Sequence, residues 1–218
     1  MIRGAIFDLD GVLLDSMAIW NDLGARYLQN QGIQPEPGLS ETLFSMSMEQ
    51  GAEYMKQHYH LSQTAEEILA GIQEMLQDFY FYKVKVKEGA KELLAFLQEK
   101  GIPMTAATSS PREHVTRALQ RNGLLDYLKK IDTTSEVGES KHSPLIYRKA
   151  AEYMGIRPEE TLVFEDSLYA LQTAKQAGFR AIGVYDSAGE TNQAGVKETG
   201  EVYLKKLTDF LGVFEKLN

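Results

Sequence analysis

Two aspartates, Asp8 and Asp10, stand directly after the apolar residues 5–7 near the start of the chain. The apolar run predicts a buried strand over residues 5–8, and a charge at the edge of an apolar core costs free energy. Asp10-Gly11 is also an ordinary turn sequence, so a turn is one open interpretation of this stretch. The other is a metal site that includes a carboxylate nucleophile.

Polar residues also follow three later apolar segments. Because ligands of an open parallel sheet bind beyond the carboxyl ends of its strands, these residues are expected to meet the two aspartates at one edge. Each group alone has an ordinary interpretation as a helix cap or, for a lysine, as a solvated side chain. Four such strand ends in one chain favour a common site. The groups are Thr108, Ser109 and Ser110 after residues 103–107, Lys141 after the loop that follows 130–132, and Glu165 and Asp166 after 161–164.

The residue types at these four ends suit phosphoryl transfer. Asp8 and Asp166, on neighbouring strands, can hold a hard cation such as Mg²⁺ through their carboxylate oxygens. Lys141 and the hydroxyl of Thr108 can bind the other oxygens of a phosphoryl group. Asp8 can attack phosphorus and form an aspartyl phosphate. Asp10 can give a proton to the leaving oxygen and then take one from water.

The elements that must position these residues alternate along the second part of the chain. From residue 84 onward, apolar strand candidates are separated by amphipathic helical patterns, which predicts an α/β fold with a parallel sheet covered on both faces. Glycines at 101, 123 and 178 are placed to end three of the helices. The predicted strands are 5–8, 103–107, 130–132, 161–164 and 181–184, and the predicted helices are 89–100, 111–122, 143–154, 168–177 and 207–217.

Residues 15–82 interrupt this alternation. They contain no convincing strand and read as three or four amphipathic helices, one of which places Ile19, Leu23, Tyr27 and Leu28 on a single face. We expect a smaller helical domain at 15–82, inserted into a core made of residues 1–14 and 83–218. The alternating lysines at 83, 85 and 87 are compatible with an edge strand or a solvated linker, and we favour the linker.

Composition and charge exclude several classes of protein. The 218 residues are 43% hydrophobic and 25% charged, which is typical of a globular protein, and none is cysteine, which excludes disulfides and thiolate catalysis. The net charge of −8 with no basic block argues against nucleic acid, and no apolar stretch approaches the roughly 20 residues that span a bilayer. We expect a cytoplasmic protein with a small-molecule substrate and no nucleic-acid or membrane partner.

The assembled residues resemble the haloacid dehalogenase superfamily of phosphotransferases over nearly the whole chain. The four motifs are matched by Asp8-Leu9-Asp10-Gly11-Val12, Thr108, Lys141 and Glu165-Asp166. The resemblance implies a Rossmann-like parallel-sheet core with an inserted α-helical cap domain. It also implies Mg²⁺ bound by Asp8, the backbone carbonyl of Asp10 and Asp166. Glu165 would either bind the ion itself or support the residues that bind it. Members that remove halide lack the second aspartate, so Asp10 indicates phosphoryl transfer.

Within that superfamily the sequence is most similar to the β-phosphoglucomutase-like group, with three departures. Trp20 stands where the mutase has a cap histidine, and His142 stands where relatives often have proline after the lysine. No arginine lies between residues 27 and 111 to hold a second phosphate, and residues 15–82 carry ten acidic against two basic residues. An acidic cap disfavours a bisphosphate, so we favour simple hydrolysis of small phosphate monoesters. The alternatives are a sugar phosphomutase and, more remotely, a phosphoaccepting signalling or binding protein.

The substrate itself is expected to be a small phosphorylated metabolite. The candidate contact residues are Ser109 beside the second motif and, in the insert, Trp20, Phe44, Met46 and Met48. A stripe of aromatic and methionine side chains is also what an ordinary helical core presents, but methionines suit an adaptable apolar pocket. We expect a monomer, because cap opening is easiest when no partner covers the cap.

Overall fold

The structure is a computed structural model that describes every residue except 45, 47 and 218; the side chains of 41 and 44 are also outside the description. It divides the chain into two compact units. The core unit comprises Met1–Met17 and Val84–Asn218, and the helical unit comprises Ala18–Lys83.

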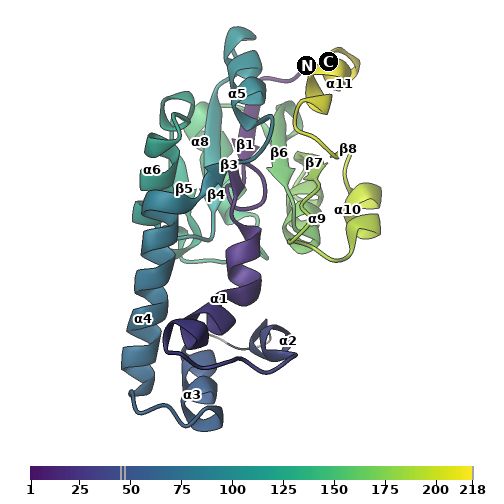
Figure 1. Cartoon of the computed structure of the whole chain (residues 1–218). Helices are drawn as coiled ribbons and strands as arrows, with labels where there is room; N and C mark the ends of the chain where they lie inside the picture. Colours follow the sequence, from purple (N-terminus) through teal and green to yellow (C-terminus); the bar gives the residue numbers. More distant parts are fainter. Residues whose placement is uncertain (45, 47, 218) are drawn as a thin grey trace. The chain divides into compact units, whose positions relative to one another are not determined.

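A six-stranded parallel sheet forms the centre of the core unit (Figure 1). The strand order is β5-β4-β1-β6-β7-β8, so the first strand of the chain lies between the strands that carry the second and fourth motifs. The predicted α/β class and parallel sheet are confirmed. The strands are β1 (Gly4–Phe7), β4 (Met104–Thr108), β5 (Ile131–Thr133), β6 (Thr161–Glu165), β7 (Arg180–Val184) and β8 (Val202–Leu204).

Helices flank this sheet and end where the sequence predicts. Gly101, Gly123 and Gly178 follow α5, α6 and α9 with positive φ angles of 71°, 69° and 92°, a backbone conformation that glycine adopts without strain. The helices of the core unit are α5 (Ala90–Glu99), α6 (Arg112–Arg121), α7 (Thr134–Val137), α8 (Leu145–Met154), α9 (Leu168–Gln176), α10 (Gln193–Thr199) and α11 (Asp209–Leu217), with 3₁₀ turns at Leu125–Tyr127 and Pro158–Glu160.

The two faces of the central strands are packed by different helices. Side chains alternate along a strand, so Ile6 and Val163 point to the face covered by α8, where they pack with Tyr147. On the other face Phe7 stacks on Phe164 with ring centroids 4.5 Å apart. The next residues in register with Ile6 and Val163 are Asp8 and Glu165, which the same alternation directs toward α8.

A short strand pair lies where the chain leaves and re-enters the core unit. β2 (Leu14–Asp15) pairs antiparallel with β3 (Lys85–Val86). The preferred interpretation of residues 83–87 as a solvated linker is therefore wrong for 85 and 86, which form an edge strand. Lys83 and Lys85 are exposed, but Lys87 is partly buried. The pairing joins segments far apart in the sequence, which a local pattern does not reveal.

The described residues of the helical unit form four helices and one π-helical turn. Ile19, Leu23, Tyr27 and Leu28 are all buried, which confirms the predicted apolar face of the first helix. Thr64 begins α4 with a capping box, in which its hydroxyl accepts from Glu67 N and the Glu67 carboxylate accepts from Thr64 N. The elements are α1 (Met17–Asn30), α2 (Leu39–Phe44), α3 (Met48–His58), α4 (Ala65–Asp78) and the π-helical turn η1 (Phe79–Lys83).

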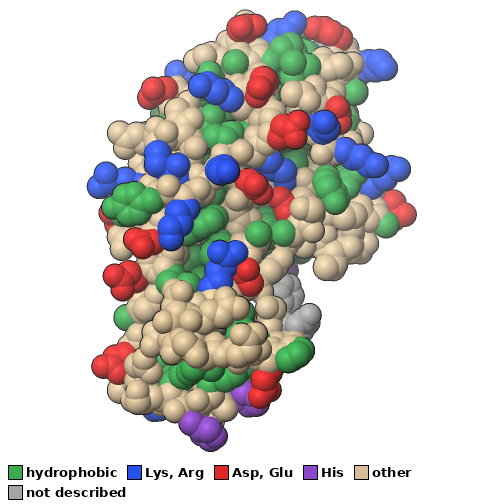
Figure 2. Space-filling view, in the orientation of Figure 1, with side chains coloured by type: hydrophobic (Ala, Val, Ile, Leu, Met, Phe, Trp, Pro, Cys, Tyr) green, Lys and Arg blue, Asp and Glu red, His purple; other side chains and the backbone are tan. Residues whose placement is uncertain are grey.

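Charged side chains of both signs are interspersed over much of the face seen in the space-filling view (Figure 2). Among the described residues, no helix combines the length and the apolar character needed to cross a membrane.

Candidate active site

Three carboxylates meet at the carboxyl end of the central strands. Asp8 follows β1, Glu165 ends β6 and Asp166 comes next, and all three are buried. One carboxylate oxygen from each lies within 4.8 Å of the others. Three buried acids at this distance repel one another unless a cation compensates them.

Lys141 supplies one compensating positive charge. Its Nζ lies 2.6 Å from Asp8 Oδ1 and 2.6 Å from Glu165 Oε1, and the residue is only 3% exposed. The ordinary interpretation of Lys141 as a solvated surface lysine is thereby excluded. Burial acts to lower the pKa of Lys141, but Asp8 and Glu165 outweigh it and raise that pKa above its ordinary value. The ammonium is therefore charged at neutral pH.

One lysine does not balance three carboxylates. Burial, followed by repulsion from Glu165, raises the pKa of Asp8 well above its ordinary value, against the opposing pull of Lys141. Burial and Glu165 likewise raise the pKa of Asp166 to about 7. The cluster of Asp8, Glu165 and Asp166 therefore favours either bound protons or a further positive charge.

The donor set of this cluster fits a hard divalent cation. It offers carboxylate oxygens only, which are the ligands that Mg²⁺ prefers. Glu165 Oε2 is buried and has no hydrogen-bond partner among the described residues, an arrangement that costs free energy unless another group binds there. Asp8, Glu165 and Asp166 are thus the residues that would hold the ion.

Asp10 lies two residues on, and its carboxylate is held differently. Ser16 Oγ donates to Asp10 Oδ1 at 2.6 Å, and Ser110 Oγ donates to Asp10 Oδ2 at 2.7 Å. Asp10 is thus a hydrogen-bonded carboxylate outside the three-acid cluster. Sequence reasoning missed the role of both serines, although Ser110 is part of the polar stretch it singled out.

The hydroxyl residues at the end of β4 do not cap the following helix. Thr108 is buried and its Oγ1 accepts from Ser110 N at 3.0 Å, while α6 begins after Pro111 without a side-chain cap. Ser109, the predicted substrate contact, is exposed. The simple interpretation of this stretch as an N-cap is therefore wrong.

The acids at the end of β6 precede Ser167, which is the N-cap residue of α9. The Ser167 side chain makes no capping bond to α9, and Glu190 Oε2 accepts from Leu168 N at 3.1 Å instead. Glu165 and Asp166 are thus left to the buried cluster.

Tyr147, on α8, is a further member of the site that the sequence did not indicate. Its hydroxyl donates to Glu165 Oε1 at 2.6 Å, the same oxygen that Lys141 contacts. Burial and then the charge of Glu165 raise the pKa of Tyr147 well above its ordinary value, so the hydroxyl keeps its proton and acts as a donor. In the sequence Tyr147 is only one apolar position of an amphipathic helix.

The predicted substrate contacts of the insert belong to the helical unit. Trp20 on α1 and Met48 on α3 are each more than a third exposed, and Met46 is partly buried. The Phe44 side chain lies outside the described part of the chain. A substrate role for Trp20, Met46 and Met48 stays a prediction.

Comparison with known proteins identifies the family. A family model described as haloacid dehalogenase-like hydrolase matches residues 5–184, a span that contains Asp8, Asp10, Thr108, Lys141 and Asp166. The chain belongs to the haloacid dehalogenase-like hydrolases. The predicted resemblance is confirmed, and the enzyme is a phosphohydrolase of that family.

Relatives of this hydrolase include several phosphatases. It is 26% identical over 217 residues to a phosphorylated carbohydrates phosphatase from Thermotoga maritima, covering 99% of this chain and 100% of the relative. It is 30% identical over 207 residues to a phosphoglycolate phosphatase from Pectobacterium atrosepticum, covering 89% and 87%.

Solved structures show the same fold. A proposed β-phosphoglucomutase from Thermotoga maritima superposes with a TM-score of 0.87 at 24% identity, covering all of both chains. A haloacid dehalogenase family hydrolase from Deinococcus radiodurans, solved with phosphate and sodium, has a TM-score of 0.78 at 22% identity and covers 99% and 96%.

Proposed function

We propose that this hydrolase is a Mg²⁺-dependent phosphatase that cleaves small phosphate monoesters through an aspartyl phosphate on Asp8. The observation that carries the proposal is the buried group of Asp8, Glu165 and Asp166 around Lys141, beside the separately held Asp10. Bound Mg²⁺ would offset the negative charge of the carboxylates and of the phosphoryl oxygens.

The residues of the chain divide the reaction between them. An Asp8 carboxylate oxygen attacks phosphorus, and the acyl-phosphate bond forms as the bond to the ester oxygen breaks. Asp10 gives the departing alcohol its proton. Lys141 and Thr108 bind the negatively charged phosphoryl oxygens during the transfer.

The second half of the reaction regenerates the enzyme. Asp10, now a carboxylate, takes a proton from the water that attacks phosphorus. Inorganic phosphate leaves and the Asp8 carboxylate is restored. Ser16 and Ser110 hold the Asp10 carboxylate in position through the hydroxyl protons they donate to its two oxygens.

The substrate we propose is a phosphorylated sugar or another small alcohol with a single phosphate. The named relatives act on phosphorylated carbohydrates and on phosphoglycolate, both small phosphate esters. The acidic residues of the helical unit and the absence of arginine between 27 and 111 disfavour a second phosphate group.

Phosphate release from a panel of small esters, including β-glucose 1-phosphate, tests the proposal. With Mg²⁺ present we expect release from one or several esters, and loss of all release in Asp8→Asn and in EDTA. The matched control is Asp15→Asn, at an exposed aspartate on β2, which should retain activity. Silence with every ester, with conversion of the sugar 1-phosphate only when a bisphosphate primer is added, would establish the phosphomutase instead. Silence in both assays would leave the binding or signalling protein.

Asp10→Asn tests the acid/base assignment. Without the carboxylate, water must attack the phosphoenzyme without a base, so turnover should fall about 10²–10⁴-fold. When the reaction with an ester labelled on its phosphate is quenched with acid, the label should be found accumulated on the protein. A fully active Asp10→Asn enzyme would mean that another group moves the proton.

A further inference from the structure

Lys87 makes a set of contacts that the proposed chemistry does not use. It lies just after β3, where the chain has re-entered the core unit. Its Nζ donates to Gly11 O, to Tyr185 O at 2.6 Å and to Asp186 Oδ2 at 2.8 Å. Three acceptors match the three protons of an ammonium group.

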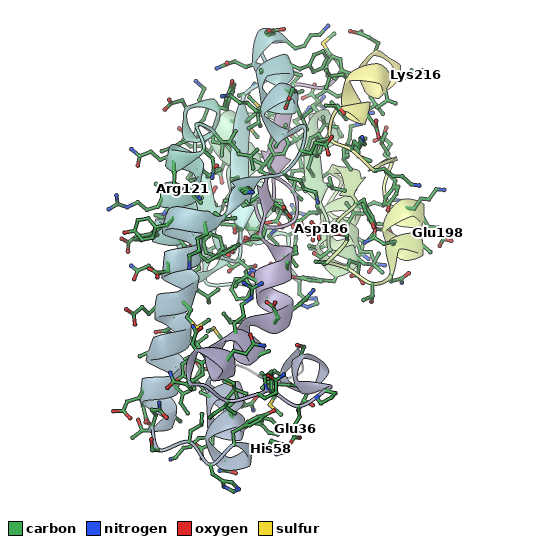
Figure 3. The ribbon with its side chains drawn as sticks, in the orientation of Figure 1. Glu36, His58, Arg121, Asp186, Glu198 and Lys216 are labelled. Atoms are coloured by element: carbon green, nitrogen blue, oxygen red, sulfur yellow. The ribbon has the colours of Figure 1, made fainter. Side chains whose placement is uncertain are left out.

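These acceptors come from two loops at the carboxyl end of the sheet. Gly11 follows the motif aspartates after β1, and Tyr185 and Asp186 follow β7. Asp186, labelled in Figure 3, is 7% exposed, and its other oxygen accepts from Ala188 N at 2.8 Å. Lys87 therefore ties the β1 loop to the β7 loop through a largely buried ion pair.

The Asp166 carboxylate lies against both loops. A Cβ on Gly189 would lie 2.8 Å from Asp166 Oδ2, and a Cβ on Gly11, whose φ is +77°, would collide with the same oxygen. Both loops thus approach Asp166 as closely as glycine allows. A shift of either loop would change the space in which the Asp166 carboxylate lies.

We propose that Lys87 is a positioning residue that clamps the Gly11 loop to the Tyr185–Gly189 loop and thereby holds the Asp166 carboxylate in place to bind a divalent cation. This inference rests on the proposed function, since it gives Asp166 a metal to bind. Asp186 completes the clamp because it anchors the ammonium and fixes the turn at Ala188. Neither residue touches the reacting atoms.

Direct binding of Mn²⁺, followed by its electron paramagnetic resonance signal, tests the clamp without relying on turnover. Lys87→Met should weaken Mn²⁺ binding about tenfold, the lower end of what is lost when a group supporting a metal ligand is removed. Lys87→Arg keeps the charge, but its planar guanidinium cannot donate to three acceptors from one atom. Its Mn²⁺ affinity should therefore lie between those of the wild type and Lys87→Met. The matched control is Lys85→Met, an exposed lysine two residues earlier, which should bind as wild type does.

Asp186→Asn provides a second test if Lys87→Met proves unstable. It keeps the shape of the side chain, removes the charge and should weaken Mn²⁺ binding in the same direction. Circular dichroism and urea unfolding identify the variants that are folded, and only these are compared.

The outcomes separate the two proposals. The clamp is overturned if folded Lys87→Met or folded Asp186→Asn binds Mn²⁺ as tightly as Lys85→Met does. It is also overturned if the wild type does not bind Mn²⁺. A wild type that binds Mn²⁺ but releases phosphate from no ester overturns the proposed function, and the variants still decide the role of Lys87. A higher Mg²⁺ requirement for phosphate release in Lys87→Met than in Lys85→Met supports both.

Discussion

The two units of this hydrolase treat charge in opposite ways. The core unit buries Asp8, Lys141, Glu165 and Asp166 at one edge of its sheet. In the described part of the helical unit, no charged residue is buried, and polar contacts such as the hydrogen bond between Glu36 and His58 (Figure 3) are exposed. Buried charge needs a compensating function or partner, whereas exposed charge costs little and contributes little. Chemistry is therefore expected from the core unit, and shape and electrostatic selection from the helical unit.

Removal of the Lys141 ammonium from the carboxylate cluster should have the largest effect. Lys141→Met leaves Asp8 and Glu165 buried without the ammonium that pairs with both, which should end phosphate release and lower the free energy of unfolding by about 3–5 kcal/mol. Urea unfolding and phosphate release measure the two effects, with Lys129→Met, at an exposed lysine, as the control. The stability deficit should narrow at pH 5, where the carboxyls can take up protons. A variant as stable as the control at pH 8 would contradict the ionic account of the site.

The pH dependence of cation binding should be the next largest effect. Because the pKa of Asp166 is raised from 3.8 to about 7, the folded state binds more protons than the unfolded state between these values, so this group lowers stability as pH rises through that window. Mg²⁺ displaces the proton and should raise the melting temperature more at pH 8 than at pH 6. Thermal unfolding with and without MgCl₂ at the two pH values measures this rise in melting temperature. In Asp166→Asn the rise should be the same at pH 8 and pH 6. An equal effect of MgCl₂ at both pH values would show that Asp166 is not a ligand.

The smallest effect should come from the helical unit. Thr64→Ala removes the capping box of α4 and should cost about 1 kcal/mol of unfolding free energy while phosphate release stays unchanged. Ser62→Ala, two residues earlier and exposed, is the control. A large loss of turnover in Thr64→Ala would break the division between the two units.

Much of the fold and the centre of the site could be predicted from the sequence. β1, β4 and β6 are fully buried and mostly apolar, and β7 is buried after its first residue, so the signal of these strands is local. The parallel order of the sheet brings Asp8 and Asp166 to one edge, and the loop that follows β5 adds Lys141. The short elements were missed: β8 and α10 lie at the sheet margin with partly exposed, mixed residues, and β2 and β3 exist only because they pair with each other.

The supporting residues of the site were harder to predict. Tyr147 looks like any core position of α8, because nothing local distinguishes a tyrosine that packs from one that also donates to a buried acid. Lys87 stands in an alternating lysine pattern typical of solvated chain, and its acceptors at 11, 185 and 186 come from distant segments. Such roles depend on tertiary contacts.

The β2–β3 pair has a consequence for how this chain can change over time. Leu14 pairs with Val86, so both ends of the insert leave the core unit from neighbouring positions of one small ladder. The insert is thus equivalent to a loop of the core unit whose two ends are held together by the β2–β3 pairing. Doubling the length of such a loop adds only about 0.6 kcal/mol of closure entropy. A lineage can therefore lengthen, shorten or replace the insert, and with it the substrate selection proposed for it, while the strands that carry Asp8 and Glu165 keep the same register.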